Sequence, residues 1–149
     1  MAYYWLLVDV RERVIIATAK EEFKSSEEAM RSGKRFKYSE ENQQLLSSFE
    51  PRLLICEMPR PPEAAAGTFR WYLINMCHFK SHRHVVAVSS DTYSTYDRCF
   101  RSAKRHYYDN FFSTTVADCC SSLQVYVEKI DMYPPVLSSS DCCCCCSVI

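Results

Sequence analysis

Two short stretches decide the fold: WLLVDV at residues 5–10 and WYLINM at residues 71–76. Each begins with a tryptophan, continues with aliphatic or aromatic side chains, and carries a polar residue, Asp9 or Asn75, at its fifth position. Runs of this composition are typical of β-strands. Two such similar runs in one chain also indicate an internal repeat, which the flanking residues can test.

The match continues when the second copy is given four extra residues in its next turn, around residues 79–84. From that point the two copies are offset by seventy residues. Residues 15–18 fall on 85–88, 23–27 on 93–97, 31–35 on 101–105, and 53–56 on 123–126 without a further gap. These ordered matches predict a duplication rather than a chance similarity.

Each copy predicts the order strand, strand, helix, strand. A hydroxyl that can cap a helix, Ser25 or Thr95, follows each pair of strands, with an acid two positions later. Apolar side chains then recur at helical spacing. Strands are expected at residues 3–10, 13–19 and about 52–58 in the first copy, and at 69–76, 85–90 and about 123–130 in the second.

The predicted fold is therefore one pseudo-symmetric α+β domain over residues 1–137. Repeat one covers residues 3–58, a proline-rich linker covers 59–68, and repeat two covers 69–130. Residues 138–149 are expected to form a disordered tail rich in serine and cysteine.

The first copy resembles a known family. Val14-Ile15-Ile16-Ala17-Thr18, then Phe23-Lys24-Ser25, then Ala29 and Gly33 in a helix are similar to the YegP-like family of small bacterial tandem-repeat proteins. The resemblance extends over both copies and implies that they share one antiparallel sheet, exchange their last strands, and pack their helices on one face. It implies no activity. Ala103 replaces the helix glycine in copy two, and the cysteine tail is an addition to the family's pattern.

Composition excludes several classes of protein. Gly33 and Gly67 are the only glycines in the sequence, so it contains neither a P-loop nor a dinucleotide-binding fingerprint. Lysine plus arginine equals aspartate plus glutamate, with eighteen of each, so no overall field attracts nucleic acid or an anionic surface. The first residues lack the features of a secretory signal, which predicts a reducing, cytoplasmic compartment.

The tail carries the clearest localisation pattern. Cys146-Ser147-Val148-Ile149 fits a prenylation box, and Cys142, Cys143, Cys144 and Cys145 are candidate palmitoylation sites. One lipid gives only marginal membrane binding, so a second would make the anchoring stable. Prenylation requires eukaryotic cytosol, so a bacterial chain would have to be delivered into a host. The alternatives are an inert tail and a thiolate metal site, although adjacent cysteines suit a tetrahedral ion poorly.

A basic triplet occurs once in each predicted helix: Arg31, Lys34 and Arg35 in the first, and Arg101, Lys104 and Arg105 in the second. The spacing places each triplet on one helix face. If the helices pack side by side, the six charges form one stripe that could contact anionic lipids or the phosphates of RNA. Tyr93, Tyr96, Tyr107 and Tyr108 are available for base stacking in the nucleic-acid alternative. An ordinary solvated face is the third interpretation.

No catalytic residues, metal site or cofactor are predicted. Cys77, His78, His82 and His84 surround the longer turn of copy two, but no second ligand pair stands at zinc-finger spacing. A solvated loop is the favoured interpretation there. The sequence is thus interpreted as a non-enzymatic interaction module with an unknown protein partner, a membrane surface reached through its tail, and a monomeric or strand-exchanged dimeric state. A soluble nucleic-acid-binding protein is the alternative.

Overall fold

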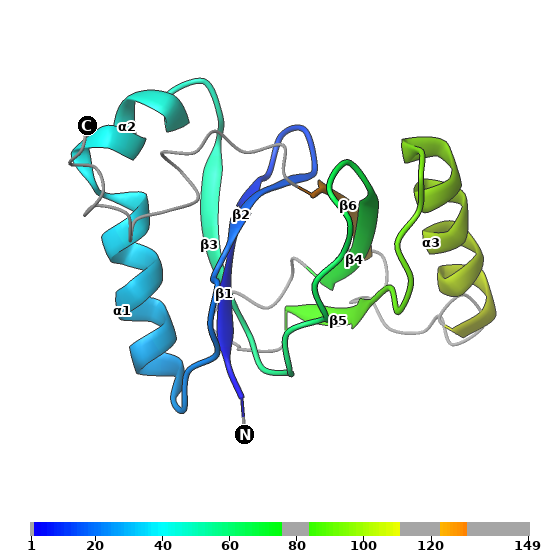
Figure 1. The fold of residues 1–149 in the computed structure, drawn as a ribbon, viewed down its shortest axis with the longest axis horizontal. Helices are drawn as coiled ribbons and strands as arrows, with labels where there is room; N and C mark the ends of the chain where they lie inside the picture. The colour runs from blue at the N-terminus through cyan, green and yellow to red at the C-terminus, as the bar shows by residue number, and fades with distance from the viewer. Residues whose placement is uncertain (1, 76–83, 111–122, 131–149) are drawn as a thin grey trace.

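The computed structural model describes residues 2–75, 84–110 and 123–130. This part of the chain contains strands and helices in an order close to the predicted one (Figure 1). They are β1 (Tyr4–Asp9), β2 (Val14–Thr18), α1 (Ser26–Lys37), α2 (Glu40–Leu46), β3 (Pro51–Cys56), β4 (Phe69–Asn75), β5 (Val85–Val88), α3 (Tyr96–Asn110) and β6 (Leu123–Lys129).

The strands form one curled six-stranded sheet in the order β3-β1-β2-β6-β4-β5. Neighbouring strands are antiparallel except for β2 and β6, which run parallel with Val14 and Val127 as partners. Arg13, in the left-handed region with φ +57°, accepts a hydrogen bond from the Val127 N–H across this seam at 3.3 Å. The α+β class is confirmed, and the prediction of a wholly antiparallel sheet is wrong at this seam.

The parallel seam follows from how the two halves are placed. In each half the first strand is antiparallel to both of its neighbours, so the second and closing strands of that half run in the same direction. The halves stand side by side in one orientation, so β2 of the first must meet β6 of the second in parallel. Because β3 pairs with β1 and β6 pairs with β4, the predicted exchange of closing strands is not confirmed.

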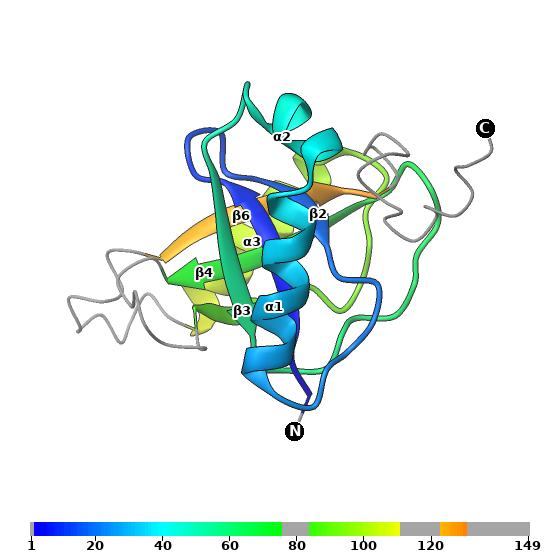
Figure 2. The same ribbon diagram turned by 90° about the vertical axis from the view of Figure 1, so that its left-hand side faces the viewer.

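The two long helices cover different halves of the sheet. Helix α1 packs on β1 and β3, and α3 packs on β4 and β6. Each half has the same tryptophan contact: Trp5 Nε1 donates to Ser32 Oγ at 3.1 Å, and Trp71 Nε1 donates to Ser102 Oγ at 3.2 Å. The sheet lies between the helices, which therefore sit at opposite ends of the molecule (Figures 1 and 2).

A core shared by both halves fills the space between them. Alternate residues of β1 point away from α1, and alternate residues of β4 point away from α3, because successive strand side chains face opposite sides. Tyr4, Leu6, Tyr72, Ile74 and Tyr126 belong to one buried cluster, and each is at most 1% exposed. Each such buried side chain contributes about 2 kcal/mol of hydrophobic free energy. This cluster therefore stabilises the two halves against each other.

Capping residues fix where the helices begin. Ser25 Oγ accepts from the Glu28 N–H at 3.1 Å, and Thr95 Oγ1 accepts from the Arg98 N–H at 3.2 Å, which confirms both predicted caps. Ser39 caps α2, a helix that the sequence analysis did not predict. The Asn42 side chain of α2 is buried and donates to the Phe36 carbonyl at 2.9 Å, so this short helix folds back on the end of α1.

The closing strands differ in register from the alignment of the two copies. Trp5 pairs with Ile55, and Trp71 pairs with Val127. Ile55 therefore corresponds to Val127, an offset of seventy-two residues rather than seventy. A shift of two residues leaves every side chain on the same face of the strand, so the hydrophobic pattern does not distinguish the two registers.

Gly33 allows α1 to approach the sheet closely. A Cβ at this position would lie 2.7 Å from Leu53 Cδ1 and 3.0 Å from Trp5 Cγ. In α3 the position is occupied by Ala103, which is fully buried. The glycine is therefore a packing requirement of the first half, and the second half accommodates one more methyl group.

Candidate functional site

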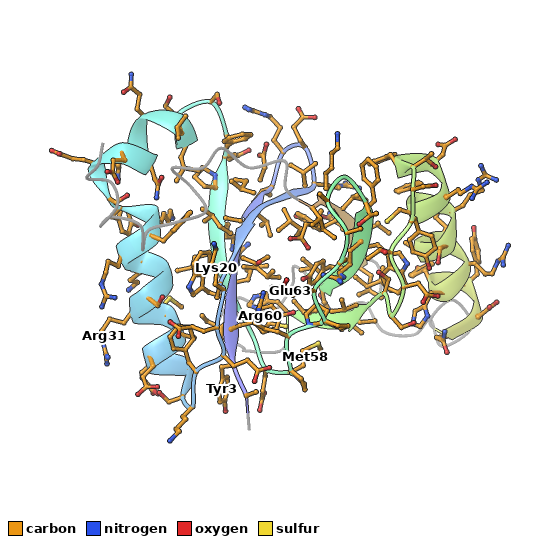
Figure 3. All side chains as sticks on the ribbon, in the orientation of Figure 1. Tyr3, Lys20, Arg31, Met58, Arg60 and Glu63 are labelled. Atoms are coloured by element: carbon orange, nitrogen blue, oxygen red, sulfur yellow. The ribbon has the colours of Figure 1, made fainter. Side chains whose placement is uncertain are left out.

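The two basic triplets are exposed, but they do not lie together. Arg31, Lys34 and Arg35 are exposed on α1, and Figure 3 shows Arg31 extending outward from that helix. The second triplet is equally exposed on α3, beyond the sheet. The expectation of a single stripe is therefore wrong, because the curled sheet separates the two helices. Each triplet has to be considered as a separate surface.

Three successive aromatic rings with a lysine at each end run along the surface of the second half. Lys129 Nζ lies 5.8 Å from the centre of the Phe69 ring, and the Phe69 and Tyr96 rings meet edge to face at 6.3 Å. Tyr96 stacks on Phe100 at 5.8 Å with an interplanar angle of 11°, and Lys104 Nζ lies 5.4 Å from the Phe100 ring. We call these five residues, Phe69, Tyr96, Phe100, Lys104 and Lys129, the aromatic-basic ladder.

The ladder is accessible from solvent. Tyr96 is 50% exposed, Lys104 and Lys129 are exposed, and Phe69 and Phe100 are half-buried. Cation–π contacts hold a charged amine beside a ring without burying the charge. The surface therefore presents flat apolar rings and unburied cations together.

Helix α1 lacks this arrangement although it carries the same basic triplet. Ser26 and Met30 stand where α3 has Tyr96 and Phe100. Lys34 corresponds to Lys104, but it has no phenylalanine one turn before it. Helix α3 therefore differs from α1 in its aromatic side chains, and in Arg98, which stands where α1 has Glu28. These differences distinguish α3 as the candidate interaction surface.

A groove of about 490 Å³ adjoins the ladder. Its walls come from the β1–β2 turn, from α3 and from β6, and they include Arg13, Tyr96, Phe100 and Tyr107. The groove brings the first half of the chain into the same surface, through Arg13 and its neighbour Glu12. Its lining mixes apolar rings with single charges, which suits contact with an amphipathic partner.

The base of the tail is next to the ladder. Lys129, a ladder residue, is the last residue of β6, and Ile130 follows it at the end of the described part of the chain. Cys142 to Cys146, the predicted lipidation sites, lie outside the described residues. Eleven residues, 131–141, separate Ile130 from Cys142. A chain of that length spans at most about 40 Å.

The two described cysteines are unsuited to nucleophilic catalysis. Cys56 and Cys99 are fully buried. Burial raises the pKa of each thiol to about 12, so both remain protonated at neutral pH, whereas a nucleophilic cysteine requires the thiolate. Cys77, His78 and His82 lie outside the described residues, and His84 is a buried residue whose carbonyl accepts from the Asn75 N–H at 2.7 Å.

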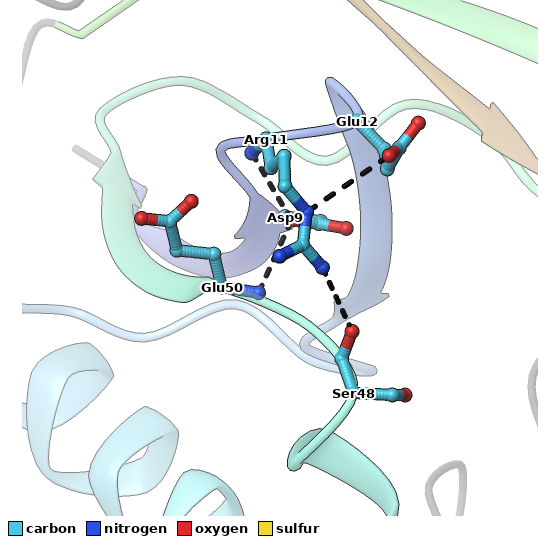
Figure 4. Close-up of polar contacts among 5 residues, drawn as sticks. All are labelled: Asp9, Arg11, Glu12, Ser48 and Glu50. Carbon is cyan, nitrogen blue, oxygen red and sulfur yellow. Dashed lines mark hydrogen bonds and ion pairs between the residues drawn. The ribbon is translucent and has the colours of Figure 1, made fainter.

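Asp9 is a buried carboxylate with a structural role (Figure 4). Its Oδ1 accepts from the main-chain N–H of Arg11 at 3.1 Å and of Glu50 at 3.2 Å. The Arg11 side chain donates from Nη2 to the Ser48 carbonyl at 3.0 Å. These bonds tie the β1–β2 turn to the residues that enter β3. They explain why a polar residue ends an otherwise apolar strand.

The described residues contain neither a cluster of metal ligands nor a membrane-spanning helix. Within residues 2–75, 84–110 and 123–130, no three potential metal-ligating side chains gather around one point. None of the helices in this part of the chain has the length and apolar character needed to cross a membrane.

Comparison of the chain with protein-family models, curated proteins and solved structures finds no match. The resemblance to the YegP-like family therefore stays a prediction. Function has to be argued from the surfaces of this chain alone.

Sequence reasoning found some of the ladder residues and missed others. Lys104 and Tyr96 were singled out, one as a basic residue and the other as a stacking residue, whereas Phe69, Phe100 and Lys129 were not. Tyr93 was expected to be available for stacking, but its hydroxyl lies 2.7 Å from Ser102 Oγ in the contact between sheet and helix. The i, i+4, i+8 spacing of Tyr96, Phe100 and Lys104 was a usable signal.

Proposed function

We propose that this chain is a duplicated, non-enzymatic interaction module held at a membrane surface by lipid-modified C-terminal cysteines. We further propose that the aromatic-basic ladder is the face that lies against anionic lipid. The observation that carries the proposal is the ladder itself, which runs from the base of the tail along α3. The matched tryptophan–serine contacts and helix caps of the two halves support the duplication.

The composition of the ladder suits the boundary between lipid headgroups and acyl chains. Rings of Tyr and Phe with neighbouring Lys are favoured there because each side chain has an apolar body and, in Tyr and Lys, a polar end. Each Lys or Arg close to an anionic bilayer contributes about 1 kcal/mol. Lys104 and Lys129 supply two such contributions from the ladder itself, and Arg98, Arg101 and Arg105 are exposed farther around α3.

A single lipid chain binds a membrane only marginally, and a second signal makes the attachment stable. The Cys142 to Cys146 run provides candidate lipid sites, and the ladder provides a protein surface as a further signal. Since the tail leaves β6 beside Lys129, anchoring would bring this end of the molecule, rather than α1, toward the bilayer. The first half would then be available to a protein partner.

The anchoring is tested by expressing the full chain in a eukaryotic cell and comparing it with Cys146→Ser. We expect the wild type to gain the mass of an isoprenoid, to lose its last three residues, and to fractionate with membranes. The substitution should abolish all three effects. An unmodified, soluble wild type would remove the lipid anchor from the proposal.

The role of the ladder is tested separately, with purified protein and vesicles of phosphatidylserine and phosphatidylcholine. The double variant Tyr96→Ala/Lys104→Glu should bind these vesicles at least tenfold more weakly than the wild type, since it loses a ring and reverses a charge. The matched control is Met30→Ala/Lys34→Glu on α1, which should bind like the wild type. Equal loss in both variants would mean that general charge, not the ladder, drives binding.

The nucleic-acid alternative is supported by the exposed Tyr96 ring and its neighbouring lysine, because aromatic rings with cations also bind single-stranded RNA. A gel shift with an RNA oligonucleotide, repeated at increasing salt, decides between them. Salt-sensitive RNA binding by a protein that ignores anionic vesicles would replace the membrane proposal with the nucleic-acid one.

A further inference from the structure

A cavity of about 520 Å³ lies between the linker and both halves of the sheet. Its walls come from β1, β2, the linker, β4 and β6, so it belongs to neither copy alone. Figure 3 shows Lys20, Arg60 and Glu63, three of the lining residues, close together near the middle of the molecule. The volume falls within the range of about 300–1,000 Å³ that is usual for small-molecule sites.

Two arginines are held beside this cavity by backbone groups. The Arg60 N–H donates to Glu22 Oε2 at 2.7 Å, and its Nη1 donates to the Lys20 carbonyl at 3.0 Å. Arg70 Nη2 donates to the Pro62 carbonyl at 2.7 Å. Each guanidinium is therefore held in position by one hydrogen bond to a main-chain carbonyl.

Both arginines keep a buried donor without an acceptor. The Nε atoms of Arg60 and Arg70 are enclosed and find no hydrogen-bond partner among the described residues. Arg70 as a whole is only 8% exposed. Buried guanidinium groups are costly unless their donors are satisfied, and buried polar groups without partners are rare in folded proteins. The two guanidinium groups are thus incompletely satisfied by the protein itself.

The charges and the apolar walls define what would fit. Lys20, Arg60 and Arg70 stand against Glu63 and Glu128 in the lining, which leaves one positive charge in excess. The remaining lining includes the apolar side chains of Pro61, Pro62 and Ile130, while Ala17, Tyr4 and Tyr72 are almost fully buried beneath it. A carboxylate is a planar acceptor that matches the guanidinium donors.

We propose that this cavity binds a small organic monocarboxylate, whose carboxylate accepts from Arg60 and Arg70 and whose apolar part lies against Pro61, Pro62 and Ile130. The site would exist only when both halves and the linker are in place. A bound carboxylate would therefore hold the linker against the sheet. Because it would bind only the folded state, it would stabilise the whole fold.

Calorimetric titration of the full chain with acetate, butyrate and benzoate tests the site, with benzamide as a neutral analogue of benzoate. We expect benzoate to bind in the millimolar range or tighter, more strongly than acetate because it also fills the apolar part. Benzamide should bind at least tenfold more weakly, since a hydrogen bond to a charged group is worth about 1.5–3 kcal/mol.

Arg70→Gln and Arg60→Gln should each weaken benzoate binding about tenfold, for the same reason. Arg60 is in the linker and outside the main core, so its variant folds even where replacement of buried Arg70 disrupts the sheet. The control is Arg101→Gln, on the exposed face of α3, which should leave binding unchanged. Binding of none of the carboxylates, or equal binding of benzoate and benzamide, would overturn the proposal, as would unchanged binding in Arg60→Gln.

Discussion

Individual polar residues in this protein act mainly by satisfying backbone groups. Asp9 illustrates this, because one carboxylate oxygen holds two main-chain N–H groups that would otherwise lack partners at the turn. The second half has Asn75 at the equivalent position of β4, and it is also buried. An amide oxygen accepts hydrogen bonds as a carboxylate does, so acceptor capacity rather than charge is what the two positions share.

We therefore expect Asp9→Ala and Asp9→Asn to differ strongly. The alanine variant removes the acceptor of two partly buried hydrogen bonds, worth about 1 kcal/mol each, whereas the asparagine variant keeps the acceptor. Urea denaturation followed by tryptophan fluorescence measures both free energies of unfolding. If the two variants were equally destabilised, the negative charge of Asp9, not its hydrogen bonding, would be the stabilising feature.

At the scale of single elements, much of the fold could be predicted from the sequence. Strand composition, the hydroxyl caps and the helical spacing of apolar residues gave all six strands and both long helices, because these signals are local. Helix α2 was missed because it is short and is stabilised by a tertiary contact, the bond from Asn42 to the Phe36 carbonyl. The placement of α1 and α3 at opposite ends was also beyond local signals, because it depends on how the sheet curls.

The tryptophan–serine contact between sheet and helix includes one more polar group in the second half than in the first. Ser32 Oγ accepts from Trp5 in the first half, whereas Ser102 Oγ contacts both Trp71 Nε1 and the Tyr93 hydroxyl in the second. Removal of the first hydroxyl leaves one polar group without this partner, and removal of the second leaves two.

Ser102→Ala should therefore destabilise the protein more than Ser32→Ala, by about 1 kcal/mol. Thermal or urea unfolding of the two single variants measures the difference directly. The variant Ser102→Ala/Tyr93→Phe serves as the control, because it removes the second polar group together with its partner and should recover part of the loss. Equal costs for the two serines would show that the Tyr93 hydroxyl is satisfied elsewhere.

For the whole molecule, the stability at high pH depends on the core between the halves. Tyr4, Cys56 and Tyr72 meet there. Burial raises the pKa of each of the three above its usual value, and the neighbouring Tyr72 and Cys56 raise the pKa of Tyr4 further. The thiol of Cys56 has a pKa of about 12 against an ordinary 9.0. These groups are neutral in the folded state, and the unfolded chain releases their protons first as the pH rises.

Stability should therefore be independent of these groups below about pH 9 and fall above it. The loss attributable to Cys56 is about 1.4 kcal/mol per pH unit between 9.0 and its folded pKa of about 12. Tyr4 and Tyr72 add to the loss above about pH 10. Urea denaturation from neutral to alkaline pH measures the slope, and Cys56→Ala should make it shallower. A flat profile would contradict the burial of these groups.

The order β3-β1-β2-β6-β4-β5 also has a polarity. In each half the closing strand lies on one side of the first strand and the second strand lies on the other. The two halves follow one another along the sheet in the same orientation. A twofold arrangement would have made the two outer edges alike, but here one edge is of the β3 kind and the other of the β5 kind. The outer edges are thus the same two kinds of strand that meet at the parallel seam inside the chain. A further three-stranded unit placed at either edge in the same orientation would continue the sheet by the same rule, because neither edge is closed by symmetry.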